Sequence, residues 1–376
     1  MGQIDMFFNS TLSINTTTLA NNAVSVRNSL GGTQIIPVLK GDAYGYGTEK
    51  VYKTLKDAIA PSHYAAAHVS EAAVLRDCGC TESIMLISGV PQAAIRDALA
   101  LNVTLTVPDV ATAHLVAQHA EKPIAVQIKL DCGLNRFGTK LGEPLDELIR
   151  AIKSLPRLHV VGVYTHFSLL DTCDEATARR ELNAYLDGLA QLEAAGIKPI
   201  LRHAAASNVS EWFPEAHLDA VRLGRRLFMG PPLSESAAET EIAEAATWRS
   251  AVTAVRNVRS DERFGYGGAF CAGRDTTLAI VSVGYGDGLE PLLCGKTKSA
   301  PVMVNGRRAQ LLGANMDACF IDANNCGAAP GAEVVFFGTC ANGAELSARE
   351  VAATIDEEGV YLTSRLTNRV GREYIG

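Results

Sequence analysis

Residues 37–47 read PVLKGDAYGYG, and they join an apolar run to a segment rich in glycine and tyrosine. The apolar run begins at Ile35 and closes on Lys40, and three glycines and two tyrosines follow within the next seven residues. A lysine at the end of an apolar strand is either a solvated cap or part of a site. Which of the two applies depends on what stands at the ends of the other apolar runs.

Eight apolar runs follow one another along the first part of the chain, and helix-periodic stretches separate them. One such stretch places Val51, Leu55 and Ile59 on a single helix face after Thr48, a candidate N-cap. The predicted strands are IIPVLK (35–40), HYAAAHV (63–69), SIMLIS (83–88), VTLTVP (103–108), IAVQIKL (124–130), HVVGVYTHF (159–167), PILRHAA (199–205) and LDAVRLG (218–224). Eight β/α units predict an α/β fold with an N-terminal (β/α)8 TIM barrel over residues 11–240. An open doubly wound sheet is the alternative, but no GxGxxG segment follows the first strand.

A mostly β C-terminal domain is predicted for residues 241–376, where short apolar strands replace the alternating pattern. These strands are TTLAIVSVGYGDG (276–288), PVMVNGRRAQLLG (301–313), ACFIDAN (318–324) and AEVVFFG (332–338). Asn305-Gly306 between two of them is a strong hairpin signal. Ser347 and Glu350 form a capping box for one late helix. Residues 1–10 precede the barrel and are expected to pair with this second domain.

The composition excludes several classes of protein. The chain has 376 residues and a net charge of −7, which argues against nucleic acid or an anionic membrane as a partner. Nine cysteines occur without a zinc-type pair, since Cys78-Gly79-Cys80 has the wrong spacing, so no metal site is expected. No secretory signal and no stretch of about 18 apolar residues is present. The sequence therefore favours a cytoplasmic protein with reduced thiols.

Polar side chains stand at five of the eight predicted strand ends. In chain order they are Lys40; Lys129, followed by Arg136; His166; His203, followed by Ser207; and Arg222, followed by Gly224. Each of them alone has a structural explanation, such as a solvated cap or a hydrogen-bonded core histidine. Because the carboxyl ends of barrel strands meet at one rim, five such groups together indicate a site.

The types of side chain at this rim suggest a cofactor. Ser207 and the backbone near Gly224 follow the last two barrel strands, where phosphate sites of barrels commonly form. Backbone N–H groups there can bind a dianion, and Tyr44 could add a hydroxyl. Lys40 across the rim could supply an amine for a Schiff base. A phosphate site together with such an amine is what pyridoxal 5′-phosphate requires.

The segment PVLKGDAYGYG also resembles the cofactor-lysine motif of the alanine racemase family, and the resemblance covers nearly the whole chain. The other similar blocks, in the order of the family, are IKLDCGLNRFG (128–138), YTHFSLLD (164–171), HAAASN (203–208), VRLGRRLFMG (221–230), FGYGGAF (264–270), VSVGYGDG (281–288), LLGANMDACFID (311–322) and LTNRVGR (366–372). The resemblance implies a barrel, a β domain and a homodimer whose active sites lie between the subunits. The implied substrate is a small amino acid.

The resemblance also implies two catalytic bases. Lys40 matches the lysine that binds the cofactor and then serves as the base for the D-antipode. Tyr266 matches the tyrosine that reaches in from the other subunit as the base for the L-antipode. Two residues on opposite faces of one carbon are what a racemase needs. The implied helpers of the tyrosine are Arg136 and Asp317, with His166 in the wider hydrogen-bond network.

Further matches imply how the cofactor and the substrate are held. Arg222 matches the arginine that faces the pyridine nitrogen, and His203 would orient it. The matched phosphate contacts are Tyr44, Ser207, Gly224 and Arg225, the last two through backbone N–H groups, while His166 lies by the ring. Met316 and Arg136 match groups near the substrate carboxylate. Lys129 matches a lysine that is carbamylated in some members of the family, where it orients the arginine.

Four residues depart from the family pattern, and three of them, Asp42, Tyr46 and Val360, are expected to affect the substrate. Asp42 stands where asparagine is usual, Tyr46 where histidine is usual, and Gly371 where proline is usual. An ungapped alignment places Val360 where the family has a tyrosine that narrows the substrate entrance, so either the register shifts by one residue to Tyr361 or the entrance is remodelled. Apart from these departures, the resemblance implies racemisation of L-alanine to D-alanine. A racemase of a larger amino acid such as serine, a related amino-acid decarboxylase and a cofactor-homeostasis protein are the alternatives.

Overall fold

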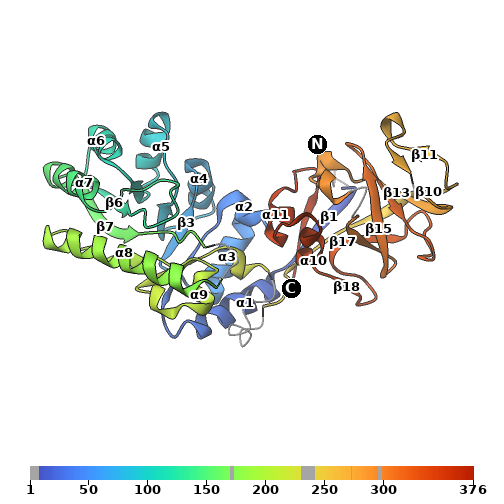
Figure 1. Ribbon diagram of the computed structural model, residues 1–376, viewed down its shortest axis with the longest axis horizontal. Coiled ribbons are helices and arrows are strands. Elements are labelled where there is room, and N and C mark those ends of the chain that lie inside the picture. The colour runs from blue at the N-terminus through green and yellow to red at the C-terminus, as the bar shows by residue number, and fades with distance from the viewer. Residues whose placement is uncertain (1–7, 170–172, 230–241, 272, 295–298) are drawn as a thin grey trace.

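The computed structural model describes residues 8–169, 173–229, 242–271, 273–294 and 299–376. The chain forms two lobes, an N-terminal barrel ringed by helices and a C-terminal lobe built around a large sheet (Figure 1). Short elements near the chain end, α10 and α11, lie where the two lobes meet (Figure 1). The architecture confirms the predicted barrel followed by a mostly β domain.

The barrel contains the eight predicted strands in sequence order. Their bounds are β2 Gln34–Pro37, β3 His63–Ala66, β4 Ser83–Leu86, β5 Leu105–Val107, β6 Ile124–Lys129, β7 Leu158–Tyr164, β8 Leu201–His203 and β9 Ala220–Leu223. Parallel pairing joins β2 to β9, β3 to β4, and β5 through β8. Single bridges close the remaining gaps: Val38 with Ala65, Met85 with Thr104, and Ala206 with Arg222. All the strand ends therefore face one rim.

Helices between the strands cover the outside of the barrel with their apolar faces. They are α1 Thr16–Ser29, α3 Thr48–Ile59, α4 Val69–Asp77, α5 Ile95–Ala100, α6 Val110–His119, α7 Glu143–Ser154, α8 Glu175–Ala194 and α9 Val209–Trp212, with short 3₁₀ turns at Gln92–Ala94, Pro214–Ala216 and Arg225–Leu227. The short element α2, Lys40–Tyr44, lies instead at the rim. In α3 the predicted face is buried at Val51, Leu55 and Ile59. The predicted N-cap was wrong by one residue, because Gly47 occupies that position and Thr48 is the first helical residue.

The C-terminal lobe is a nine-stranded sheet with the order β18-β17-β14-β15-β16-β13-β10-β1-β19. The bounds are β1 Ser10–Asn15, β10 Ala246–Val258, β13 Thr276–Val281, β14 Pro301–Val304, β15 Arg307–Ala314, β16 Cys319–Asp322, β17 Glu333–Thr339, β18 Glu345–Leu346 and β19 Gly371–Ile375; β11 Arg263–Phe264 and β12 Phe270–Cys271 form a separate hairpin. Short 3₁₀ turns lie at Tyr266–Gly268, Tyr285–Asp287, Pro291–Leu293 and Ala353–Ile355. The helices are α10 Ala348–Ala352 and α11 Gly359–Ser364.

The N-terminal strand belongs to this second sheet, where it pairs with β10 and β19. The expected domain boundary between residues 10 and 11 therefore falls inside β1, and the segment that pairs with the second domain extends to Asn15. The other expected boundary, at residues 240–241, lies outside the described residues. Gly371 opens β19 beside Thr11, and a Cβ on it would lie 2.7 Å from the Phe8 ring.

One local signal in the β domain is confirmed, and a second is confirmed in part. Asn305 and Gly306 both have positive φ and connect the antiparallel strands β14 and β15. The Ser347 hydroxyl accepts a hydrogen bond from the backbone N–H of Glu350 at 3.0 Å and so caps α10, while the Glu350 carboxylate accepts from Arg308 at 2.9 Å and does not complete the capping box. Asparagine-glycine favours this hairpin because both residues tolerate the left-handed region.

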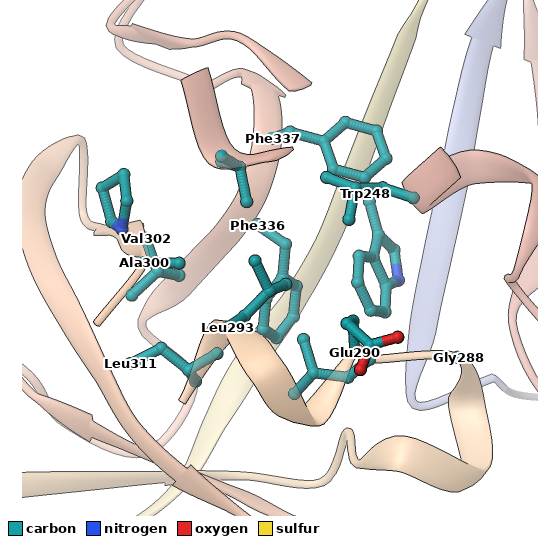
Figure 2. A pocket seen from close by; sticks show the side chains of 13 residues that line it. Trp248, Gly288, Glu290, Leu293, Ala300, Val302, Leu311, Phe336 and Phe337 are labelled. Atoms are coloured by element: carbon teal, nitrogen blue, oxygen red, sulfur yellow. The ribbon is translucent and has the colours of Figure 1, made fainter. Parts of the chain in front are cut away.

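The core of the β domain encloses a small apolar cavity, lined in part by Trp248, Leu293 and Phe336 (Figure 2). The indole of Trp248 stacks on the Phe336 ring with centroids 4.3 Å apart. Glu290 at its edge accepts a hydrogen bond from the Tyr361 hydroxyl at 2.9 Å. This carboxylate therefore has a structural role, and the cavity belongs to the packed core of the domain rather than to a reactive site.

Candidate active site

Lys40 lies just past the end of β2, at the start of a left-handed turn. The strand ends at Pro37, and Gly41, Asp42, Ala43 and Tyr44 all have φ between 52° and 60°. Left-handed backbone costs a non-glycine residue roughly 1–2 kcal/mol, so packing and hydrogen bonds must hold this turn. Immediately after Lys40, this turn reverses the course of the chain at the rim of the barrel.

Glu71 fixes this turn against the end of β3. Its carboxylate accepts hydrogen bonds from the backbone N–H of Gly41 at 2.7 Å, of Ala67 at 2.8 Å and of His68 at 3.0 Å. Glu71 and Lys40 line the same open cleft at the mouth of the barrel, together with Val360 and Tyr361 from α11. Glu71 is not among the residues predicted from the sequence, although its position just after the end of the second strand is a signal that could have identified it.

The Lys40 amine has a lowered pKa. Burial is the main cause, the positive charge of Arg136 adds to it, and the carboxylate of Glu71 opposes it. The neutral amine is the form that acts as a nucleophile or a base. Lys40 is therefore better suited to chemistry than a solvated strand cap would be.

Arg222, on β9, is buried in the barrel mouth and donates only to neutral acceptors. One terminal nitrogen bonds His203 Nδ1 at 2.8 Å and the His203 carbonyl at 3.0 Å. The other bonds the carbonyls of Thr165 at 2.7 Å and Ala204 at 2.9 Å, and His166 Nδ1 at 3.3 Å. Among the residues described, no carboxylate pairs with Arg222. Burial lowers its pKa to about 10, so it remains a cation at neutral pH.

Burial and this cation together keep the two rim histidines neutral. Burial and the charge of Arg222 lower the pKa of both His166 and His203 well below the usual value. Because a guanidinium can only donate, Nδ1 of His203 must accept, which leaves its proton on Nε2. The His203 ring also stacks on Tyr164 with centroids 5.1 Å apart, which fixes its orientation.

Ser207, Gly224 and Tyr44 form an anion cradle beside Lys40. The Ser207 hydroxyl accepts from the backbone N–H of Gly224 at 3.2 Å and from that of Arg226 at 3.5 Å. A Cβ on Gly224 would lie 2.0 Å from the Tyr44 hydroxyl, so only glycine allows this approach. Convergent N–H and O–H donors of this kind fit a phosphate group.

Lys129 lies deeper, at the end of β6, and is almost completely buried. Its amine donates to the Phe137 carbonyl at 2.5 Å. Burial, and then the charge of Arg136, lower its pKa to about 8. A buried amine with this pKa is partly neutral near physiological pH.

Three residues of the predicted site do not reach this cleft within one chain. Tyr266 lies in the tip between β11 and β12, at the end of the β domain away from the barrel, and its side chain is 80% exposed (Figure 1). Met316 is 50% exposed. Asp317 is exposed and accepts a hydrogen bond from Arg369 at 2.8 Å. These residues therefore face outward from their own subunit.

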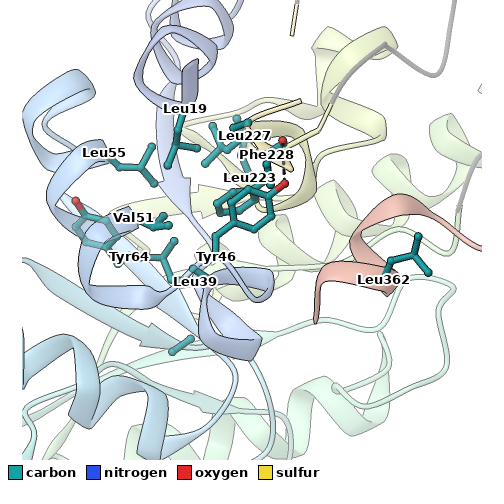
Figure 3. Close-up of a cluster of buried hydrophobic side chains, with 14 of the residues drawn as sticks. Leu19, Leu39, Tyr46, Val51, Leu55, Tyr64, Leu223, Leu227, Phe228 and Leu362 are labelled. Atoms are coloured by element: carbon teal, nitrogen blue, oxygen red, sulfur yellow. Dashed lines mark hydrogen bonds between the residues drawn. The ribbon is translucent and has the colours of Figure 1, made fainter. Parts of the chain in front are cut away.

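Two departures from the family pattern, Asp42 and Tyr46, lie away from the cleft and serve local structure. The carboxylate of Asp42 accepts from the Thr48 backbone N–H at 2.8 Å and so caps α3. The side chain of Tyr46 is fully buried in the cluster shown in Figure 3, where its ring packs against Phe228 at 4.8 Å. Of the three departures expected to affect the substrate, only Val360 lines the cleft.

Comparison with known proteins gives the same family along nearly the whole chain. Family models described as the alanine racemase N-terminal domain and C-terminal domain match residues 14–232 and 245–374. The alanine racemases of Desulforamulus reducens and Pectobacterium atrosepticum are 33% and 34% identical to the chain, and each alignment covers 96% of it and 98% and 97% of the relative.

Solved structures of alanine racemases have the same arrangement of domains. The Bacillus anthracis enzyme with bound L-Ala-P aligns with a TM-score of 0.90 at 25% identity, over 99% of this chain and 96% of that one. The Streptomyces lavendulae enzyme aligns with a TM-score of 0.89 at 27% identity, over 99% and 98%. With both domains matched and the cleft assembled as described, this chain is an amino-acid racemase that belongs to the alanine racemase family.

Proposed function

We propose that the chain interconverts L-alanine and D-alanine with pyridoxal 5′-phosphate, using Lys40 and Tyr266 of the partner subunit as its two bases. The observation that carries this proposal is the rim itself. A lysine of lowered pKa, an anion cradle and a buried arginine that pairs with no carboxylate of the described residues share one barrel mouth. The names of the relatives support alanine as the substrate.

The residues present fit the cofactor. Tyr44, Ser207 and the backbone N–H groups of Gly224 and Arg225 would hold the phosphate, and Arg222 would face the ring nitrogen. The cofactor, when bound, supplies the electron sink for the carbanion at Cα. A cation at the ring nitrogen disfavours its protonation and weakens this sink. Arg222, whose partners among the described residues are all neutral, therefore favours reversible proton transfer over side reactions.

Lys40 and Tyr266 of the partner subunit would divide the proton transfers. The lowered pKa of Lys40 suits an amine that takes the α-proton from one face. A tyrosine hydroxyl titrates near 10 and needs cationic or hydrogen-bonding neighbours, for which Arg136, His166 and Asp317 are the candidates. Tyr266 of the same chain is exposed at the far end of its β domain, which supports a homodimer with shared sites.

We further propose that Lys129 carries a carbamate. Its neutral amine would attack carbon dioxide and lose a proton, which replaces a cation beside Arg136 by an anion. The support is the buried amine, whose pKa near 8 is lowered partly by Arg136. The carbonyl carbon of such a group would give a carbon-13 NMR signal after incubation with labelled bicarbonate. That signal should be absent from Lys129→Ala and present in wild type; its absence from wild type would exclude the carbamate.

A racemase of a larger amino acid such as serine is the second candidate. Val360 lines the cleft beside Lys40, while the Tyr361 hydroxyl is turned to Glu290 at 2.9 Å. A small residue at this wall would admit a longer side chain. A cofactor-homeostasis protein resembles the barrel alone and is disfavoured by the match over residues 245–374. The second base Tyr266 and the Arg222 cation likewise disfavour a decarboxylase, which needs a stronger electron sink.

Exchange of the α-proton tests the function and the substrate together. The protein is incubated with single L-amino acids in deuterated water, and deuterium incorporation and loss of optical rotation are followed. We expect both with alanine. Exchange that is faster with serine would favour the second candidate, and no exchange with any amino acid would contradict a racemase. Loss of the bound-cofactor absorbance in Lys40→Ala would assign the cofactor to that lysine.

A cytoplasmic location is part of the same proposal. All nine cysteines are free thiols, which is usual in a reducing compartment. Within the described residues, no helix has the length and apolar character needed to cross a bilayer.

A further inference from the structure

Arg225 and Glu358 form an ion pair between the two domains at the edge of the anion cradle. Arg225 directly follows Gly224 of the cradle, and Glu358 is the N-cap residue of α11 in the β domain. The side chains are 19% and 31% exposed, so both charges are partly removed from water. The family resemblance accounts for the backbone of Arg225 but for neither of these side chains.

Both charges act at the cradle. Burial is the main reason why the pKa of the Tyr44 hydroxyl is raised. The charge of Arg225 is the next largest influence and lowers this pKa, and the charge of Glu358 follows and raises it. The same hydroxyl occupies the space that a Cβ on Gly224 would need. Glu358 also lines the cleft that contains Lys40. A phosphate bound at Tyr44 and Gly224 would therefore experience an attractive and a repulsive charge together.

We propose that the Arg225 side chain is an additional phosphate-binding cation, and that Glu358 offsets it and sets how tightly the cradle holds a phosphate dianion. This inference rests on the proposed function, because the phosphate is that of the cofactor. In a partly dehydrated site, opposite charges at similar distances largely cancel, and removal of either one leaves the other unbalanced. The two side chains must then have opposite effects on the same binding constant.

The test compares Arg225→Gln with Glu358→Gln in the full-length protein. Dissociation constants are measured by equilibrium dialysis for pyridoxal 5′-phosphate and for pyridoxal, which lacks the phosphate. We expect Arg225→Gln to weaken binding of the phosphate ester by about tenfold, as for loss of one charge-assisted contact. Glu358→Gln should tighten it by roughly threefold to tenfold. Binding of pyridoxal should change in neither variant.

The controls are Arg308→Gln and Glu350→Gln, which break an exposed ion pair in the β domain with the same changes in net charge. They should leave both constants as in wild type. If both cradle variants weaken binding, or neither changes it, the ion pair only joins the domains and the inference is wrong. A change in pyridoxal binding equal to that of the ester would also refute it, as a distortion of the site. Failure of wild type to bind the ester would instead overturn the proposed function.

Discussion

Lys40 acts as a nucleophile or a base only when its amine is neutral, so the pKa of that amine sets the pH range of its chemistry. Burial and the charge of Arg136 lower this pKa, and Glu71 partly opposes them. A lowered pKa means that the neutral form is reached at a lower pH than for an ordinary lysine. The same surroundings that lower the pKa of the amine thus prepare it for reaction.

Arg136→Gln should move the pKa of Lys40 upward, since it removes one of the two causes that lower it. The readout is the pH dependence of the rate at which the cofactor-free protein binds pyridoxal, which carries no carboxylate for Arg136 to contact. The curve should shift to higher pH, while the distant Arg308→Gln should leave it in place. A curve that stays fixed or moves to lower pH in Arg136→Gln would refute this electrostatic account.

Gly224→Ala tests the close approach in the cradle. The new Cβ would lie 2.0 Å from the Tyr44 hydroxyl, and such overpacking costs about 1–3 kcal/mol in the free energy of unfolding. Tyr44→Phe removes that hydroxyl, so the double variant should recover part of the loss. Denaturant unfolding of the four proteins measures the coupling. Strictly additive effects would show that the two residues do not meet as described.

At the scale of elements, the turn after β2 shows what sequence patterns reveal and what they miss. The alternation of apolar runs and periodic helices is regular, so all eight barrel strands were predicted. The left-handed turn was not, because Ala43 and Tyr44 have no preference for positive φ, although Asp42 tolerates it. Tertiary contacts impose it, including the Tyr44 ring against Phe228 at 5.4 Å.

The candidate site likewise contains residues that sequence patterns predict and residues whose positions depend on tertiary packing. The rim residues could be predicted because strand ends of a barrel meet at one edge, and Lys40, His166, Ser207 and Arg222 do so. Strand β1 was placed only approximately, because Ser10–Asn15 is short and is stabilised by partners far along the chain. The burial of Tyr46 depends on packing that no local pattern contains (Figure 3).

Asp42 is expected to contribute to the stability of α3 and not to the choice of substrate. Its carboxylate caps the helix at the Thr48 N–H, so Asp42→Ala should lower the free energy of unfolding by about 0.5–2 kcal/mol. Asp42→Asn keeps a capping oxygen and should change it little. Thermal or denaturant unfolding gives the comparison. A changed ratio of activities on alanine and serine in Asp42→Asn would contradict this assignment.

At the scale of the whole molecule, the two lobes meet on the segment that follows Lys40. A Cβ on Gly45 would lie 2.0 Å from the Thr363 carbonyl in α11, and the Tyr374 hydroxyl of β19 donates to the Tyr46 carbonyl at 3.1 Å. The β domain therefore holds the turn that follows Lys40 in its own barrel. It also carries Tyr266 away from that barrel, so a site that uses both Lys40 and Tyr266, as proposed, requires a partner subunit.

Mixing two inactive variants tests this central claim most directly. Lys40→Ala and Tyr266→Phe chains are unfolded, mixed in equal amounts and refolded, and racemisation of L-alanine is measured against each variant refolded alone. In a hybrid dimer, one site receives Lys40 from one chain and Tyr266 from the other, so random pairing should restore about a quarter of the wild-type activity. Activity no higher than the average of the separate variants, with hybrid dimers shown to be present, would contradict a two-base site shared between subunits.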